Sequence, residues 1–550
     1  MSEIAAVPAA PRRALSAWEW RVVWLLVLCF ALRNLPWRLD DLDQAKQANV
    51  SLEMIEAGHW WFQHTPGGKA IATKPPLVGW MSAGVYVLPF SNWDLAWRLP
   101  SMVAALALAY LMWRAGEALW PGRGGVVATA AYGFNLLAPK LATLVRTDMP
   151  LTFFITAVGL ITWHHARDGG QRPWTSVSRR AVFGLLLAAM MTKGPVVYAF
   201  LLPGMLAHSW ISRRRGGDWT RLWGGWWHWS LPLVPFLLWA LWGMASVPGF
   251  YAQVVGKEFF GRFTVGEHAV HKSQSVFLYL GQLCIRWVPW AVLLLAVTIR
   301  SHRLWTALCR ETGTLWLVCW AAGGFVLMSL VPSKRPDRIF PVVPPLALVT
   351  VALLARASRP KEAPAAAAPV LPGADAASLP PAPPSAPAVI AMPAVPRWPW
   401  EWAQRAVAVA VVLGLGSVVY YVARTYLSHD HARASFAAHV RRLEAGKQVG
   451  LVTTKASQET DETMLVYLRQ MNFLSPAEAI QRWSTGKLDA VVVSENARGE
   501  FGTLLEPFAA TQPVLETAGS KPGYLLLAGH RPDDKRKANT KPPDGARNGR

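Results

Sequence analysis

Long apolar runs alternate with short polar connections along residues 20–356. A helix needs roughly 20 apolar residues to cross a bilayer, so this pattern predicts a polytopic α-helical membrane protein with about eleven spans. The run at 77–90 is too short to span, and we expect an interfacial or half-inserted helix there. The run near 20–35 lacks a small-residue cleavage site, and it is expected to persist as a signal anchor. A run at 405–427 predicts the last span.

The pattern changes after Arg356. An Ala- and Pro-dominated stretch follows, which cannot bury a core and therefore predicts an extended linker. Beyond the last apolar run, strand-like segments alternate with helical ones and predict a small soluble α/β module; the strand-like segments are 450–453, 489–493 and 524–527. The polar, basic end of the chain is predicted to be disordered. The predicted divisions are 1–356 for the transmembrane domain, 357–398 for the linker, 399–428 for the last helix, 429–530 for the module and 531–550 for the tail.

Composition agrees with a membrane protein, since 53% of residues are hydrophobic and only 16% are charged. The net charge is +22, but the charges lie between apolar runs rather than on one soluble face, which argues against nucleic-acid binding. Short cytoplasmic loops collect Lys and Arg. Placing the basic stretches inside puts the other connections, and the C-terminal module, outside. Those outer connections are 37–96, 146–148, 193–195, 248–275 and 333–338.

Polar residues in the outer connections are the candidates for chemistry. Asp43 is expected in the first turn of a helix, where it either serves a reaction or merely caps that helix. Asp148 lies between two apolar helices, where a carboxylate is costly unless it is solvated, paired or functional, and the same reasoning applies to Lys193 with the opposite sign. Lys74 precedes two prolines, which hold it on a stiff corner beside the bilayer, where it can meet a lipid phosphate.

Three cations occupy the outer connection near residue 335, against the positive-inside tendency; they are Lys334, Arg335 and Arg338. A phosphate is the natural compensating anion for such a cluster. In the loop 248–275, Arg262 and the histidines His268 and His271 either join the same site or lie at the lipid headgroups. The sequence has no local metal-ligand spacing, so no metal and no other cofactor is indicated.

The order of these pieces resembles the GT-C glycosyltransferase superfamily of protein O-mannosyltransferases and lipid A 4-amino-4-deoxy-L-arabinose transferases. The resemblance covers residues 20–356. Its matching pieces are Asp43, Glu53-Met54, Gly58-His59-Trp60, Lys74-Pro75-Pro76-Leu77, Asp148-Met149-Pro150, Thr192-Lys193-Gly194, Glu258 with Arg262-Phe263, Ser333-Lys334, and Pro341 with Pro344-Pro345-Leu346.

The resemblance implies a polyprenyl-phosphate sugar donor and an active site on the periplasmic side of a bacterial inner membrane. It also implies that Asp43 is the catalytic aspartate, Asp148 the second acidic residue and Lys74 a ligand of the donor phosphate. The chain departs from the family pattern at Gln44, Thr73 and Arg338, where a Glu, an acidic residue and a Tyr are usual. These departures leave the sugar open.

The expected reaction is an inverting displacement in which negative charge builds on the departing lipid phosphate. Fixed cations can stabilise this charge without reorganising; the candidates are Lys74, Lys193, Arg262, Lys334 and Arg335, with His271 and Arg338 as possible substrate contacts. Asp43 takes the proton of a hydroxyl acceptor, or only positions charge if the acceptor is a phosphate. The acceptor is a glycolipid of the lipid A type, a protein or a glycan.

Two other classes of function remain open from the sequence. A transporter or flippase of a lipid-linked anionic sugar also needs apolar spans and cations at phosphate height. Many transporters show repeat symmetry between halves, and the chain has no visible internal repeat. A membrane scaffold that presents the C-terminal module explains the linker, but it does not explain Lys74 or Asp148. An enzyme assay without a sealed compartment separates the first class from a transferase.

Overall fold

The computed structural model describes residues 16–35, 39, 42–68, 70–89, 92–167, 172–262, 274–300, 302–359, 396–427, 431–470, 473–505, 513–517 and 523–528. The predicted linker and basic tail fall almost wholly outside these ranges, and so do the loop histidines His268 and His271. The side chain of Arg262 is likewise not described.

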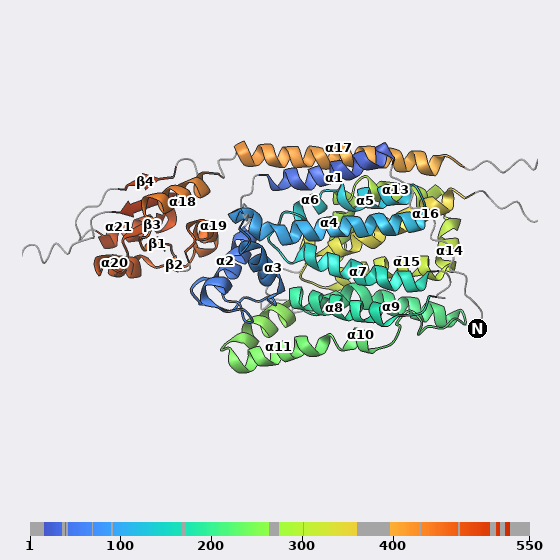
Figure 1. Ribbon diagram of the computed structural model, residues 1–550, viewed down its shortest axis with the longest axis horizontal. Coiled ribbons are helices and arrows are strands. Elements are labelled where there is room, and N and C mark those ends of the chain that lie inside the picture. The colour runs from blue at the N-terminus through green and yellow to red at the C-terminus, as the bar shows by residue number, and fades with distance from the viewer. Residues whose placement is uncertain are drawn as a thin grey trace, which may run out of the picture.

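A bundle of long helices forms the body of the molecule, and the helices run along a common direction (Figure 1). Its members are α1 (Ala17–Asn34), α4 (Trp93–Leu119), α5 (Gly124–Gly133), α7 (Asp148–Ala166), α8 (Ser176–Lys193), α9 (Val196–Arg214), α11 (Leu233–Ser246), α15 (Thr312–Leu330), α16 (Val343–Ala357) and α17 (Trp398–Leu427). Shorter helices complete it: α6 (Ala138–Leu141), α10 (Trp227–Ser230), α12 (Leu278–Arg286), α13 (Trp290–Arg300) and α14 (Arg303–Arg310). At one end of the bundle lie α2 (Leu42–Ala57) and α3 (Leu77–Tyr86).

Five helices in the described residues are long and apolar enough to cross a membrane, or six if the pair α12–α13, bent by 101°, counts as one span. The five are 93–119, 227–246, 312–330, 336–357 and 398–427. Helices α1, α7, α8 and α9 lie alongside them in the bundle but are too polar for the same test. The prediction of a largely helical membrane fold is therefore confirmed, whereas the count of about eleven spans is not.

Small residues let two central helices approach closely. At Gly204 of α9, an added Cβ would lie 2.7 Å from the Cα of Trp320, and at Gly323 of α15 it would lie 2.5 Å from the backbone nitrogen of Gly204. Such contacts leave no room for a side chain, and they are typical of packing between membrane helices. Helix α15 in turn packs against η5 (Pro336–Val342), which also packs against α7 and so connects this close helix pair to the polar end of the bundle.

The C-terminal region contains a five-stranded sheet in the order β2-β1-β3-β5-β4. Its strands are β1 (Val449–Val452), β2 (Phe473–Leu474), β3 (Ala490–Ser494), β4 (Leu515–Glu516) and β5 (Tyr524–Ala528). Its helices are α18 (His431–Leu443), α19 (Gln458–Leu468), α20 (Pro476–Ser484) and α21 (Arg498–Leu505). Strand β1 pairs in parallel with β2 and β3, whereas β5 pairs antiparallel with β3 and β4. The three strand-like runs predicted from the sequence are β1, β3 and β5.

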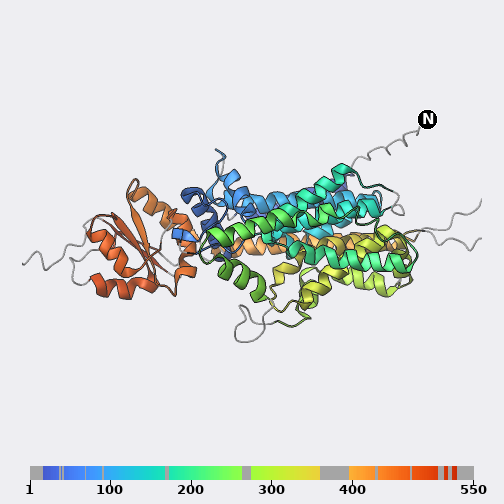
Figure 2. The ribbon, with the colours of Figure 1, turned by 90° about the horizontal axis from the view of Figure 1, so that it is seen from below.

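This C-terminal region lies against the end of the bundle that carries α2 (Figure 2). One buried apolar cluster contains Ala48 and Leu52 of α2 together with Leu465 of α19. Polar contacts add to it, since the Asn49 amide donates to the Glu462 carbonyl at 2.9 Å. Such a mixed interface fixes the sheet next to α2 rather than leaving it on a free tether.

Glu462, only 8% exposed in this interface, makes the contact sensitive to pH. Burial raises the pKa of its carboxyl from 4.5 to about 7, although the charge of Lys46 opposes the shift. The folded state then holds this proton more tightly than the unfolded state, so the contribution of Glu462 to stability is largest below about pH 4.5 and falls until the pH passes about 7. We expect Glu462→Gln to raise the melting temperature at pH 8 by several degrees and to change it little at pH 5. A matched Glu500→Gln change at an exposed site should have no such pH dependence; equal effects of both would contradict the assignment.

The basic connections gather at the opposite end of the bundle. There Arg215 donates to the Cys309 carbonyl at 2.5 Å, and Arg356 pairs with Glu311 at 2.7 Å. Arg167 and Arg310 line one cavity together with Arg356. The charge asymmetry that the sequence predicted between connections is thus an asymmetry between the two ends of the structure.

Candidate functional site

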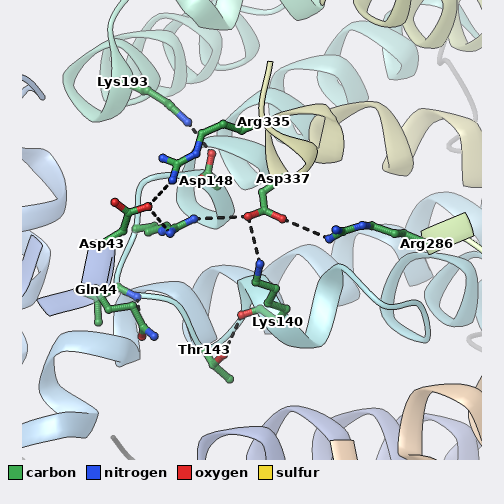
Figure 3. Close-up of polar contacts among 11 residues, drawn as sticks. Asp43, Gln44, Lys140, Thr143, Asp148, Lys193, Arg286, Arg335 and Asp337 are labelled. Atoms are coloured by element: carbon green, nitrogen blue, oxygen red, sulfur yellow. Dashed lines mark hydrogen bonds and ion pairs between the residues drawn. The ribbon is translucent and has the colours of Figure 1, made fainter. Parts of the chain in front are cut away.

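Charged side chains from four separate parts of the chain meet at the polar end of the bundle (Figure 3). Asp43 lies in the first turn of α2, where the helix dipole favours a carboxylate. Lys140 is in α6, and Arg146 is in the connection to α7. Arg286 ends α12, and Arg335 and Asp337 lie at the start of η5. Pro336 opens η5 and lacks a backbone N–H, so the chain turns there and presents charges on either side.

Arg146 links the two carboxylates of this site. Its guanidinium contacts Asp43 Oδ2 through Nη2 and lies 3.4 Å from Asp337 Oδ2 through Nη1. Arg335 donates to the same Asp43 oxygen at 2.6 Å. Asp43 is thus held by two guanidinium groups from segments nearly 200 residues apart. Charge-assisted bonds of this kind fix geometry more strongly than neutral ones.

Asp337 pairs with three cationic side chains. Its carboxylate lies 3.3 Å from Lys140 Nζ, 3.4 Å from Arg146 Nη1 and 3.7 Å from Arg286 Nη1. A buried carboxylate with several cationic partners compensates charges that are costly near the bilayer. One carboxylate does not neutralise three cations, so the group keeps positive charge for an anionic ligand.

A cavity of about 430 Å³ opens at this network. It is lined by Asp43, Lys140, Arg146, Arg286, Arg335, Pro336 and Asp337. Four cations face two anions, which leaves an excess of two positive charges over the described lining. A cavity whose wall is nearly all charged excludes an apolar ligand and favours an anion such as a phosphate.

The Asp43 carboxylate is held in its ionised form. Partial burial acts to raise its pKa, but the charges of Arg146 and Arg335 outweigh it, so the pKa lies below its ordinary value. A carboxylate with a lowered pKa is a weak proton acceptor near neutral pH. The environment of Asp43 therefore favours the positioning of charge over the removal of a proton from a hydroxyl.

Asp148 and Lys193 pair with each other beside the cavity but do not line it. Lys193 Nζ lies 2.5 Å from Asp148 Oδ1, and their side chains are 12% and 13% exposed. Asp148 begins α7 and Lys193 ends α8, so each charge also complements its helix dipole. Each of these two charges is tolerated between apolar helices because the other compensates it.

We expect Asp148→Asn and Lys193→Met each to lower thermal stability strongly, because each leaves a mostly buried charge unpaired, at a typical cost of roughly 3–5 kcal/mol. The double variant should recover most of the lost stability. Melting temperatures of the three variants, measured on one set of samples, check this. A double variant that melts as low as the worse single variant would contradict the pairing.

The remaining predicted residues take different places. Lys334 is buried and donates to the Gln274 carbonyl at 3.1 Å, and the loss of hydration lowers its pKa. Arg338 donates to the Ser333 carbonyl at 3.0 Å and interacts electrostatically with Asp148 and Asp43. Lys74 Nζ lies 3.4 Å from Thr73 Oγ1, in the segment that leads into α3. None of these three lines the described cavity.

Sequence reasoning did not assign four members of the site: Lys140, Arg146, Arg286 and Asp337. Lys140 and Arg286 lie within or beside apolar runs, and an ionisable residue at such a position is a functional candidate by default. That signal was present and could have identified them. Arg146 and Asp337 flank assigned residues, but only the folded chain shows that one bonds to the other.

Similar proteins agree with this architecture. The chain is 25% identical over 340 residues to the undecaprenyl phosphate-alpha-4-amino-4-deoxy-L-arabinose arabinosyl transferase of Edwardsiella ictaluri. The aligned residues cover 61% of this chain and 59% of that protein. It is 26% identical over 318 residues to the protein of the same name from Pseudomonas aeruginosa, with 56% and 54% covered. The matched region is thus less than two thirds of these relatives' length. No model of a protein family matches the chain.

The fold is also similar to that of a solved structure. ArnT from Cupriavidus metallidurans bound to undecaprenyl phosphate aligns with a TM-score of 0.64 at 20% identity, over 93% of this chain and 98% of that one. The chain resembles the GT-C glycosyltransferases. The apo structure of the same Cupriavidus metallidurans ArnT aligns with a TM-score of 0.59. This likeness confirms the resemblance that the order of motifs predicted, and it extends beyond the last apolar helix into the C-terminal region.

Proposed function

We propose that the chain is a membrane glycosyltransferase that moves a sugar from a polyprenyl-phosphate donor to a lipid A-type glycolipid. The observation that carries this proposal is the cationic cavity, which brings four cations and two carboxylates to one end of an apolar bundle. An anionic headgroup at the end of a long lipid fits such a place. The arabinosyl transferases that the chain resembles are named for an undecaprenyl phosphate sugar.

In the proposed reaction, the donor phosphate occupies the cavity and leaves from the anomeric carbon with inversion. Arg335 and the other lining cations stabilise the growing negative charge, and because they are already held in place they need no reorganisation. Lys74, Lys193, Lys334 and Arg262 are proposed as further phosphate contacts, and His271 and Arg338 as contacts to the rest of the substrate. Metal ions are not needed for this charge stabilisation.

Asp43 is proposed to hold Arg146 and Arg335 in position and to balance charge, with Asp148 as the second acidic residue. Its lowered pKa supports an acceptor that is itself an ionised phosphate, because such an acceptor loses no proton in the reaction. A phosphate-bearing glycolipid is such an acceptor. A hydroxyl acceptor on a protein or glycan needs a stronger base than this carboxylate.

We further propose that the protein lies in the bacterial inner membrane with this cavity facing the periplasm. The basic connections gather at the opposite end, which the positive-inside tendency assigns to the cytoplasm. The division into a transmembrane domain, a linker, a last span at 399–428 and a soluble periplasmic module at 429–530 belongs to the same proposal, as do the about eleven spans.

The test is a transfer assay on purified protein in detergent, with undecaprenyl-phosphate aminoarabinose and lipid A. We expect glycosylated lipid A and free undecaprenyl phosphate in equal amounts. A second incubation with dephosphorylated lipid A tests the proposed acceptor group. A transporter or flippase releases no free lipid phosphate without a sealed compartment, so release of none from intact, correctly folded protein would overturn the enzyme assignment. Equal turnover of the dephosphorylated acceptor would overturn only the phosphate acceptor.

A further inference from the structure

A carboxylate of α2 and two imidazoles of the loop between α2 and α3 converge outside the lining of the cationic cavity. Glu53 lies in α2, His59 follows the end of this helix by two residues, and His64 lies in the loop after it. One ligand atom of each lies within 4.8 Å of the other two. Carboxylate oxygen and imidazole nitrogen are ligands that zinc and similar divalent transition metals bind.

The hydrogen bonds within the described residues leave this cluster incomplete. Glu53 is 2% exposed, and its Oε1 lies 2.7 Å from His59 Nδ1. The other oxygen, Oε2, is buried and has no hydrogen-bond partner in the part of the chain that the structure describes. The same holds for His64 Nδ1. Buried polar atoms without partners are costly, and a shared cation would satisfy both.

We propose that Glu53, His59 and His64 bind one divalent transition metal ion, with zinc as the best fit. Zinc bonds of about 2.0–2.2 Å place tetrahedral ligand atoms roughly 3.3 Å apart, so the present separations need only small side-chain rotations. The two imidazole rings already lie 4.4 Å apart between centroids. Three protein ligands leave a fourth position for water.

No sequence motif marks this metal site, because the three ligands are six and then five positions apart, unlike the short repeats of common zinc motifs.

The ion would connect the helix that carries Asp43 to the loop that leads to Lys74. His64 forms a β-bridge with Ile71, and the neighbouring Gln63 carbonyl accepts from Ala72 N at 2.7 Å. The Gln63 amide also donates to the Pro76 carbonyl at 3.2 Å. A metal at His64 thus fixes the backbone on both sides of Lys74, which is a structural role that does not depend on the proposed reaction.

The test uses the full chain, purified without a histidine tag, stripped with a chelator and dialysed against micromolar zinc. Elemental analysis should find one zinc per chain, and zinc should raise the melting temperature. His64→Gln should lose this zinc and weaken binding by more than the roughly 10- to 100-fold typical of a lost outer partner. His59→Gln, at a more exposed position, should do the same without leaving a buried gap.

His439→Gln is the matched control among the chain's 13 histidines, because His439 is exposed and bonds only to the Ser435 carbonyl of its own helix in the described structure. It should keep the full zinc content. The proposal is overturned if the wild-type chain keeps no zinc, or if His59→Gln and His64→Gln bind as much as this control. If His64→Gln does not fold, His59→Gln decides the outcome alone.

Discussion

Asp43→Asn should lower the turnover number by roughly 10²–10³ while the donor KM does not rise. The asparagine keeps the shape of the side chain and its capping ability, but it no longer balances Arg146 and Arg335. The two guanidinium groups then repel each other, and Arg335 loses its position at the cavity. Donor binding survives because the cavity becomes more positive. Steady-state kinetics on purified protein, with a melting curve from the same sample, measure both effects.

The pH dependence distinguishes positioning from base catalysis at Asp43. Because its pKa is lowered, the carboxylate is ionised throughout the neutral range, and its contribution is lost only as the pH falls below the ordinary Asp range near 4. We therefore expect no rise in wild-type turnover attributable to Asp43 between pH 6 and 8. The control is Asp218→Asn, an exposed carboxylate that pairs with Arg221 at the other end of the bundle. Near-normal activity in Asp43→Asn would show that Asp43 only caps α2 and has no role in the reaction.

Arg335→Gln should lower turnover by a similar roughly 10²–10³-fold, because it removes a fixed cation at the point where negative charge develops in the proposed reaction. At 53% exposure, Arg335 is more accessible than Arg146, and its guanidinium can reach a bound phosphate. The effect should fall more on turnover than on donor KM, since the interaction strengthens as the phosphate leaves. Arg335→Lys should restore only part of the activity, because an ammonium cannot bond to carboxylate and phosphate in the same planar fashion.

The matched control for this change is Arg498→Gln, which removes an arginine of 59% exposure from an ion pair with Glu516 in the C-terminal region. It should leave turnover unchanged. If Arg335→Gln and Arg498→Gln behave alike, the leaving phosphate does not depend on Arg335. If both lose activity together with thermal stability, the effect is on folding rather than on the reaction.

Secondary structure and fold type were determined largely by local pattern. Apolar runs predicted the long helices, and alternating strand-like segments predicted β1, β3 and β5, because each of these elements buries residues with its own period. The two-residue strands β2 and β4 were missed, since so short an edge strand exists only through pairing with its neighbour. The count of about eleven spans stays a proposal, because helices such as α7 and α8 are long enough to span but fall outside the five or six that are also apolar enough among the described residues.

The identity of the candidate acids was also visible in the sequence. Asp148 and Lys193 stand where bundle helices begin or end, and a charge at such a position requires a partner or a function. Asp43 stands in the first turn of the polar helix α2, where it is a candidate cap or reacting group. The order of motifs further predicted the GT-C likeness that the similar proteins bear out. Local sequence could not say which partner each charge takes, because the partners lie far away along the chain.

Only the tertiary structure decided those pairings. It joined Asp148 to Lys193, Asp43 to Arg146 and Arg335, and Asp337 to three cations, and it brought Glu53 next to His59 and His64. The physical reason is that charge–charge energies depend on distance and local dielectric, both of which are set by helix packing rather than by sequence separation. The sequence thus determined which charges the bundle must accommodate, and the packing of its helices decided which of them compensate one another and which remain for a ligand.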